Sequence, residues 1–256
     1  DFALRFAEEP SRVWHPTDDD LGDDSGLVWY HTIEFPDGSI TPGMYDHRPL
    51  VPHYGFPASL RGKRALDVGS GDGFWAFELE RRGAEVTSLD IETFADTDFP
   101  RALHRIYVDH PVKLSFRRGM EIAHRRLGSK VKLVNRAVYD LDPDDIGTFD
   151  FVHAGDILLH LRDPALALQR IRSVTDGECL LADVFDPALD ELGVGPGLTR
   201  YRGGWTDAMW WAPALSTLAQ MVADAGFRDV QIVTTYNLAP RGAAQGPWRA
   251  VLRAHT

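Results

Sequence analysis

Residues 64–75 read RALDVGSGDGFW, an apolar run that ends in three closely spaced glycines. A short run of this kind, bounded by a turn signal, is typical of a strand buried within a parallel sheet. Glycines directly after such a strand let the backbone turn tightly and let a ligand approach the main-chain amides. The dinucleotide fingerprint needs its third glycine three residues after the second, where this chain has Phe74. The stretch therefore predicts a strand, a ligand-binding turn and a helix, and it disfavours NAD.

The pattern of strands and helices continues after this stretch. Segments with helical spacing alternate with short apolar runs as far as residue 227, and two strand-like runs, 229–238 and 248–256, follow one another at the end. Strands that alternate with helices are typical of a doubly wound sheet. We therefore predict an α/β fold that is Rossmann-like and doubly wound, with a mostly parallel seven-stranded sheet and one antiparallel edge strand.

Residues 1–60 differ from the rest of the chain. They are rich in Pro, Gly, Asp and His, they include the acidic run DDDLGDD at 18–24, and they show little periodicity. We expect residues 1–60 to form an N-terminal cap or lid extension over one domain, residues 61–256. A glycine-rich segment at about 186–212 is expected to be a substrate-shaping insertion in that domain.

Composition limits the possible functions. The chain has 256 residues, a formal net charge of −11 and a single cysteine, Cys179, which excludes a disulfide framework and a multi-Cys zinc site. No apolar run reaches the roughly 18–20 residues of a membrane span, and no signal-peptide pattern is evident, so we expect a cytoplasmic protein. The only group with metal-ligand chemistry matches no recognised spacing, so we expect no metal ion; its members are His31, Asp46, His47 and His53. The oligomeric state is left open.

The acidic balance also bears on nucleic-acid binding, because phosphate neutralisation by basic residues supplies much of the affinity of nucleic-acid enzymes. One segment, 101–136, is an exception, since it gathers many basic side chains: Arg101, Arg105, Lys113, Arg117, Arg118, Arg125, Arg126, Lys130, Lys132 and Arg136. A solvated helical face explains this segment most simply, and a phosphate-bearing ligand or an RNA backbone is the alternative. A nucleic-acid partner is therefore not expected.

Two acids complete the glycine turn. Asp67 lies just inside the first strand, and Asp90 ends the next one, where a carboxylate can accept hydrogen bonds from ribose hydroxyls. This combination resembles motif I and the ribose acid of class I S-adenosylmethionine-dependent methyltransferases. The resemblance implies S-adenosylmethionine as cofactor, with contacts from Asp67, Gly69, Gly71, Gly73, Asp90, Ile91, Ala137, Val138 and Gly155.

Three longer segments narrow the resemblance. WYHTIEFPDGSITPG at 29–43, FDFVHAGDILLHLRDPALAL at 149–168 and WWAPALSTLAQMVADAGF at 210–227 resemble the tRNA wobble-uridine carboxymethyltransferase family and its small-molecule relatives. That family holds the extra carboxylate of its cofactor with a tyrosine, where this chain has Leu159, and with a lysine that has no counterpart around His31. Leucine cannot donate a hydrogen bond to a carboxylate.

We therefore expect ordinary methyl transfer to a hydroxyl or amine of a small metabolite, in a specialised pathway. One alternative is a tRNA wobble-uridine modifying enzyme, either a methyltransferase or a carboxymethyltransferase. The other is a protein that binds the cofactor without catalysis.

The candidate catalytic residues follow the fourth predicted strand, in HAGDILLHLRD at 153–163. The carboxyl ends of the strands face the ligand crevice in such a sheet, which places Asp156 and His160 there. Imidazole titrates near neutral pH, so His160 is the first candidate for the base, with a helix-turn role as the alternative. Asp156 is expected to contact the acceptor or to cap a helix, His31 is an alternative base, and His153 is expected to be buried inside the strand.

Aromatic and cationic residues suggest an acceptor pocket. The Trp-Tyr-His triplet at 29–31 precedes the core and can fold over the cofactor, and the insertion carries further tryptophans at 205, 210 and 211. Packing of the insertion onto the sheet is the other explanation for those tryptophans. The expected substrate-binding residues are Trp29, Tyr30, Leu159, Arg200, Tyr201 and Trp205.

Overall fold

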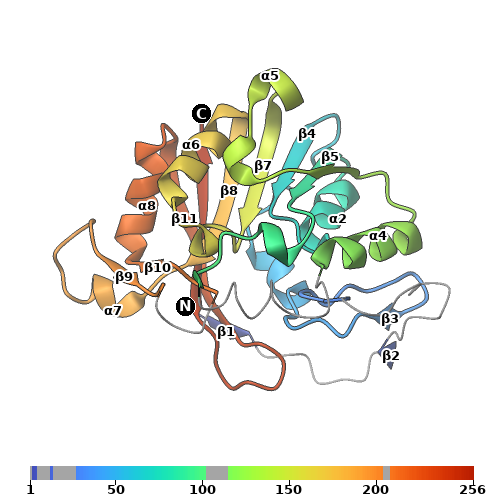
Figure 1. The fold of residues 1–256 in the computed structure, drawn as a ribbon, viewed down its shortest axis with the longest axis horizontal. Coiled ribbons are helices and arrows are strands. Elements are labelled where there is room, and N and C mark those ends of the chain that lie inside the picture. The colour runs from blue at the N-terminus through green and yellow to red at the C-terminus, as the bar shows by residue number, and fades with distance from the viewer. Residues whose placement is uncertain (1, 5–11, 14–26, 102–114, 204–207) are drawn as a thin grey trace.

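The computed structural model describes residues 2–4, 12–13, 27–101, 115–203 and 208–256. Its centre is an eight-stranded sheet with the strand order β1-β11-β12-β8-β7-β4-β5-β6 (Figure 1). In that order the strands are β1 (Phe2–Leu4), β11 (Arg228–Leu238), β12 (Trp248–His255), β8 (Thr175–Val184), β7 (Phe149–Gly155), β4 (Arg64–Val68), β5 (Glu85–Asp90) and β6 (Lys132–Asn135).

The sheet is mostly parallel. Strands β6, β5, β4, β7 and β8 pair with one another in parallel, whereas β12 pairs antiparallel with both β8 and β11. The prediction of a doubly wound, mostly parallel, seven-stranded sheet is confirmed, and its antiparallel strand is β12, which lies near one edge, between β8 and β11. The three-residue β1 adds an eighth strand, parallel to β11.

Helices cover both faces of the sheet. Neighbouring residues of a strand point to opposite faces, so a strand that is apolar throughout needs a packed layer on each side. Phe151 packs into the cluster that holds residues of α2 (Phe74–Arg81) and α4 (Phe116–Leu127). The next residue, Val152, packs into the cluster that holds residues of α6 (Pro164–Ser173) and α8 (Leu215–Asp224). The helix pairs α2/α4 and α6/α8 therefore form the two outer layers (Figure 1).

The glycine turn joins β4 to α2. Gly73 is the N-cap of α2 and has a φ of 94°, a left-handed conformation that glycine adopts without strain. A Cβ at Gly73 would lie 2.1 Å from the sulfur of Met120 on α4. The glycine therefore allows both the turn and the close approach of the two helices.

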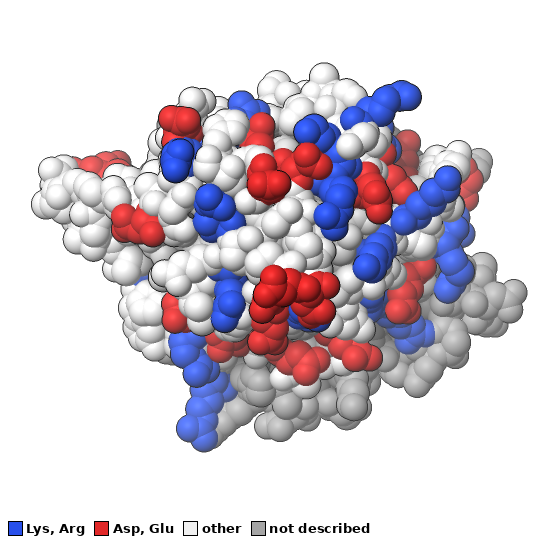
Figure 2. Space-filling view, turned by 90° about the horizontal axis from the view of Figure 1, so that it is seen from above, with Lys and Arg blue, Asp and Glu red and all other residues white. Residues whose placement is uncertain are grey.

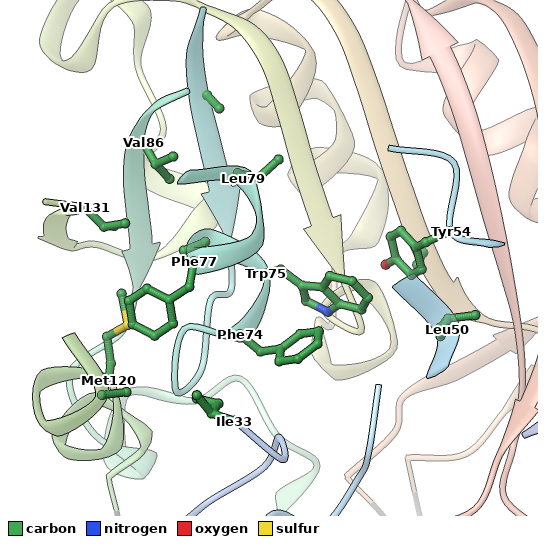
Figure 3. Packing of buried hydrophobic residues seen from close by; sticks show 14 of the residues in the cluster. Ile33, Leu50, Tyr54, Phe74, Trp75, Phe77, Leu79, Val86, Met120 and Val131 are labelled. Carbon is green, nitrogen blue, oxygen red and sulfur yellow. The ribbon is translucent and has the colours of Figure 1, made fainter. Parts of the chain in front are cut away.

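The described part of the expected cap, residues 27–60, belongs to the hydrophobic core. Ile33, Leu50 and Tyr54 lie in the same buried cluster as Phe74 and Trp75 of α2 (Figure 3). This part contains β3 (Ser39–Ile40), which pairs with β2 (Arg12–Val13), and the 3₁₀ helix η1 (Arg48–His53). The segment is thus held to the start of α2, beside the glycine turn.

The expected insertion contains α7 (Pro187–Asp190) and a small antiparallel ribbon of β9 (Thr199–Tyr201) and β10 (Trp211–Pro213). In Figure 1 these elements lie below α8, at the lower left and away from β4 and β5. The short helix α5 (Pro143–Ile146) precedes β7.

The described surface mixes charges of both signs. Figure 2 shows basic and acidic side chains interspersed on the face seen there. Within the basic segment, Arg126 pairs with Asp37 at 3.0 Å and Arg136 pairs with Asp145; residues 102–114 of that segment lie outside the described residues. Among the described helices, none is both long and apolar enough to span a bilayer.

Candidate cofactor and acceptor cleft

A cleft opens at the carboxyl ends of β4, β5 and β7, where doubly wound sheets bind their ligands. Its volume is about 1150 Å³ including the open mouth. Residues of the glycine turn, the β5 end, the loop after β6, the β7 end and the cap all line it. The predicted site residues that it brings together are Tyr30, His31, Gly69, Gly71, Asp90, Ile91, Ala137, Val138, Gly155, Asp156 and His160.

Asp90 lies beside the glycine turn at one end of the cleft. The amide of Gly71 donates a hydrogen bond to one carboxylate oxygen at 2.6 Å, and the amide of Ile91 donates to the other at 2.7 Å. Burial raises the pKa of Asp90 to about 6. A carboxylate oxygen has two lone pairs, so each oxygen can accept another hydrogen bond from the cleft. This geometry fits the vicinal hydroxyls of a ribose.

Two further glycines have no room for a side chain. Gly69 has a φ of 72°, and a Cβ there would lie 2.8 Å from Cδ1 of Ile157. A Cβ on Gly155 would lie 2.9 Å from the ring of His153. Both glycines line the cleft, and with no side chain they let a ligand approach their backbone.

The loop after β6 forms the next part of the wall. Ala137 precedes the 3₁₀ helix η3 (Val138–Asp140), and its apolar side chain and that of Val138 both line the cleft. The Tyr139 hydroxyl donates to Asp98 at 2.9 Å, and burial raises the pKa of Tyr139 to about 12. Asp98 follows the 3₁₀ helix η2 (Phe94–Asp96), so this bond joins the segment after β5 to the loop after β6. Together they enclose one part of the cleft.

Asp67 and Gly73, both expected to contact the cofactor, do not line the cleft. The Asp67 carboxylate is bonded to Nδ1 of His153 at 2.6 Å, and Nε2 of His153 is bonded to the Tyr54 hydroxyl at 2.9 Å. His153 is fully buried, which confirms the expectation for that residue. Asp67 is therefore part of a buried network behind the cleft, and Gly73 serves the helix start.

The cap contributes Tyr30, His31, His47 and Tyr54 to the opposite wall. Asp72, which sequence reasoning missed, attaches this segment to the glycine turn. Its carboxylate accepts hydrogen bonds at 2.8 Å from the backbone amides of Tyr30 and His31, and it also pairs with Nδ1 of His31. The position of Asp72 between two turn glycines was the available signal, but its partner lies 41 residues away.

Asp156 lines the cleft but is not free to act on an acceptor. Arg249, another residue missed from the sequence, donates from Nε to both Asp156 oxygens at 2.8 and 2.7 Å, and the Tyr30 hydroxyl donates at 2.9 Å. Burial alone would raise the pKa of Asp156, but Arg249 and these hydrogen bonds outweigh it and hold the pKa below its usual value. Nor does Asp156 cap the next 3₁₀ helix, η4 (Leu158–His160), whose N-cap is Ile157. Asp156 therefore anchors Tyr30 and Arg249.

His160 lies at the mouth of the cleft. Its Nδ1 is 2.6 Å from the backbone oxygen of Ala208, a contact that requires a proton on Nδ1. Burial lowers the pKa of His160, so the ring is neutral near pH 7. The edge of its ring meets Phe99, with the centroids 5.2 Å apart. His160 thus offers a neutral imidazole in an aromatic setting.

Several residues expected to contact the acceptor do not line this cleft. Leu159 points away from the cleft and packs against Val184 and Ala212, because it lies on the opposite side of η4. Arg200 pairs with Asp186 at 2.7 Å. Tyr201 packs on the tryptophans of the β9–β10 ribbon, and Trp29 is buried in the core. Trp205 lies outside the described residues.

The described residues contain no cluster of three or more His, Cys, Asp or Glu side chains that could hold a metal ion. Of the four residues in the cap with metal-ligand chemistry, Asp46 forms an ion pair with Arg48, whose Nη2 lies 2.8 Å from the Asp46 carboxylate.

Comparisons with known proteins agree with this geometry. A family model described as "Methyltransferase domain" matches residues 48–232. Among curated proteins, the chain is 31% identical over 135 residues to the ubiquinone biosynthesis O-methyltransferase of Alkalilimnicola ehrlichii, covering 52% of this chain and 46% of that protein. It is 30% identical over 149 residues to that of Marinobacter nauticus, covering 57% and 51%. The match thus spans about half the length of these relatives.

Among solved structures, the N-terminal domain of EvdMO1 with SAH bound superposes with a TM-score of 0.61 at 18% identity, covering 89% of this chain and 91% of that one. At this identity the likeness concerns the fold. The family model covers well over half of the sequence. The chain therefore belongs to the methyltransferase domain family and has the Rossmann-like fold and strand-end cleft of class I S-adenosylmethionine-dependent methyltransferases.

Proposed function

We propose that this S-adenosylmethionine-dependent methyltransferase methylates a hydroxyl group of a small, uncharged and largely apolar molecule. The observation that carries the proposal is the lining of the cleft, whose residues we assign to a cofactor part and an acceptor part. One part holds Asp90 beside the glycine turn, and the other holds three imidazoles among aromatic rings: His31, His47 and His160 with Tyr30, Tyr54, Trp75, Phe99 and Phe116. The O-methyltransferase names of the curated relatives support a hydroxyl acceptor.

The cofactor part of the cleft fits the residues present. Asp90 would accept hydrogen bonds from the ribose hydroxyls, and the backbone of Gly69, Gly71 and Gly155 would lie along the methionine end. The apolar side chains of Ile91, Ala137 and Val138 would pack against the adenine, in the space enclosed by the loops after β5 and β6. When bound, S-adenosylmethionine supplies a methyl group already activated on a sulfonium.

The remaining tasks of the protein are to align the acceptor and to remove its proton. The aromatic wall would hold an apolar acceptor and exclude water, with residues 27–60 acting as the lid of the site. Tyr30 is fixed by Asp156, and burial raises its pKa well above the usual value, so its phenol stays neutral and packs in the wall. His160, whose Nδ1 is held by Ala208, presents its other ring nitrogen to orient the acceptor.

A hydroxyl acceptor explains the imidazoles better than an amine does. An aliphatic amine is protonated at neutral pH, so it must lose a proton before its nitrogen can attack the methyl group. A hydroxyl enters uncharged and needs only a base to ionise as it reacts. A tRNA acceptor is disfavoured by the net charge of −11 and by the acids that pair with Arg126 and Arg136.

The test combines binding with turnover. Calorimetry should show S-adenosylhomocysteine binding that Asp90→Ala weakens about tenfold or more, since one charge-assisted acceptor is lost. Incubation with S-adenosylmethionine and a panel of phenols, alcohols, amines and a tRNA transcript should give a methylated product from hydroxyl compounds only. Cofactor binding without any turnover would support a non-catalytic protein, and transfer to the amines or to the tRNA would contradict the proposed acceptor.

A further inference from the structure

The buried carboxylate of Asp72 holds the ring of His31 in a fixed orientation, and the binding of the cofactor gives no reason for this contact. Asp72 is fully buried, and its Oδ2 accepts the backbone amides of Tyr30 and His31, each at 2.8 Å. Its Oδ1 pairs with Nδ1 of the His31 ring. A carboxylate can only accept, so in the neutral ring this pairing places the proton on Nδ1 and leaves Nε2 with its lone pair. Nε2 has no hydrogen-bond partner among the described residues.

Neighbouring rings fix the direction in which Nε2 points. The His31 ring stacks on Phe74 with an interplanar angle of 15°, and it meets Tyr30 edge-on with the centroids 4.8 Å apart. Its Cε1 lies 3.8 Å from the place that a Cβ on Gly71 would occupy. Gly71 is also the residue whose amide holds Asp90. His31 therefore lines the cleft at the turn where the cofactor part and the acceptor part meet.

A second imidazole marks this place as polar. His47 is buried, its ring centroid is 4.9 Å from that of His31, and its Nδ1 has no hydrogen-bond partner among the described residues. Burial lowers the pKa of His47 well below its usual value, so the ring is neutral. His47 therefore places a second neutral imidazole next to the ring of His31.

From this arrangement we propose that His31 is the general base of the transfer and that Asp72 is its positioning residue, an assignment that rests on the hydroxyl acceptor proposed above. The acceptor O–H bond breaks, its proton goes to Nε2 of His31, and its electron pair stays on the oxygen. That oxygen forms the new bond to the methyl carbon while the carbon–sulfur bond breaks and its electron pair stays on sulfur. The Asp72 carboxylate stabilises the imidazolium that forms.

His160 is less suited to this role. Its Nδ1 faces a neutral backbone oxygen, whereas Nδ1 of His31 faces a carboxylate, which stabilises a positive ring much more strongly. An Asp–His pair of this kind also fixes the tautomer, as in the triads of hydrolases. The glycine turn would thus serve two purposes, since Gly69 and Gly71 face the cofactor while Asp72 orients the base.

The first experiment reads the tautomer without any turnover. Long-range ¹H–¹⁵N NMR of the wild-type protein with S-adenosylhomocysteine should show the His31 ring with its proton on Nδ1, with His31→Gln used to assign the signal. In Asp72→Asn the proton should move to Nε2, because the Asn amide can donate to Nδ1 while its oxygen still accepts the backbone amides. An unchanged tautomer in Asp72→Asn, or an Nε2-protonated ring in the wild type, would overturn the positioning role.

The second experiment compares two acceptors with S-adenosylmethionine: catechol, which is neutral near pH 7, and 4-nitrocatechol, which is already ionised at the assay pH. Asp72→Asn and His31→Gln should lower kcat for catechol by about 10²–10⁴-fold, the usual contribution of a general base. They should lower kcat for 4-nitrocatechol less than tenfold, because that acceptor needs no base.

Thr41→Val is the matched control for a loosened cap. The Thr41 hydroxyl bonds the backbone oxygen of His31 at 2.7 Å and does not touch the ring. This variant should slow both acceptors by the same factor. Equal losses on both acceptors in Asp72→Asn and His31→Gln would overturn the inference and leave the proposed function standing. No turnover of either acceptor by a wild-type protein that binds S-adenosylhomocysteine would overturn the proposed hydroxyl acceptor and, with it, the role of His31 as a base.

Discussion

Arg249→Met tests the buried ion pair that anchors the acceptor wall. Arg249 is 2% exposed and donates from Nε to both oxygens of Asp156. Methionine keeps much of the apolar length but removes the charge, so Asp156 would be left buried with the Tyr30 hydroxyl as its one remaining side-chain partner among the described residues. Breaking a buried pair on one side costs about 3–5 kcal/mol.

The expected loss can be converted into measured quantities. At roughly 2–4 °C per kcal/mol for a chain of this size, the midpoint of thermal unfolding should fall by roughly 6–20 °C. Urea denaturation near neutral pH should show the same loss through a lower transition midpoint, with an unchanged slope. Arg253→Met on the same strand is the matched control. Arg253 pairs with Glu178 while 30% exposed, so its pair should contribute about 1 kcal/mol or less.

The pH dependence of the loss follows from the sign of the pKa shift. In the wild type the pKa of Asp156 is held below its unfolded value, so the pair contributes stability above that unfolded value and loses it as the pH falls. Without Arg249, burial dominates and raises the pKa of Asp156, and the penalty is relieved by protonation. The gap between the wild type and Arg249→Met should therefore narrow as the pH falls toward about 4.

A double variant completes the test. Asp156 has a φ of 50°, a left-handed conformation in which glycine relieves about 1 kcal/mol of strain. Asp156→Gly combined with Arg249→Met removes both charges and should be more stable than Arg249→Met alone. A loss below about 1 kcal/mol in Arg249→Met, or additive losses in the double variant, would refute the idea that these two groups depend on each other.

Three further predictions concern the cofactor part of the cleft and the turn. Because the pKa of Asp90 is about 6, the affinity for S-adenosylhomocysteine measured by calorimetry should be constant above neutral pH and roughly tenfold weaker at about pH 5, where the carboxyl is mostly protonated. Asp90→Asn should flatten this pH profile, and a flat profile in the wild type would contradict the ribose assignment. Gly73→Ala should destabilise the fold by more than about 1 kcal/mol in urea titrations, because the added methyl group strains the backbone and collides with the Met120 sulfur. Gly62→Ala is the control: Gly62 also has a positive φ but faces open space, so this variant should lose no more stability than the backbone strain accounts for. Tyr139→Phe removes the bond to Asp98 and should weaken S-adenosylhomocysteine binding a few-fold with little change in stability; undiminished affinity would show that this bond does not shape the site.

Much of the fold could be predicted from local sequence. RALDVGSGDGFW specifies strand, turn and helix, because apolar runs, glycines and helical spacing act over a few residues. Asp90 could be found in the same way, since it ends the strand after the turn. The burial of His153 also followed from the alternation of its strand.

The acceptor side could not be predicted in this way. Leu159 was placed in the cleft from its distance along the chain to the strand end, but the 3₁₀ turn of η4 directs it to the other side. Arg200 and Tyr201 were placed there by composition, and the ribbon of β9 and β10 directs them elsewhere.

The sequence alone determined the Rossmann-like sheet, the glycine turn and the place of Asp90 at the next strand end, because each is encoded by neighbours in the chain. Only the tertiary structure decided which side chains meet across the cleft. Asp72 reaches His31 over 41 residues, and Asp156 reaches Arg249 over 93 residues, through the packing of the cap and the insertion of β12 into the sheet. Such pairs depend on strand order and register, which residue periodicity does not encode. A buried charge gains its partner only when the whole sheet has formed.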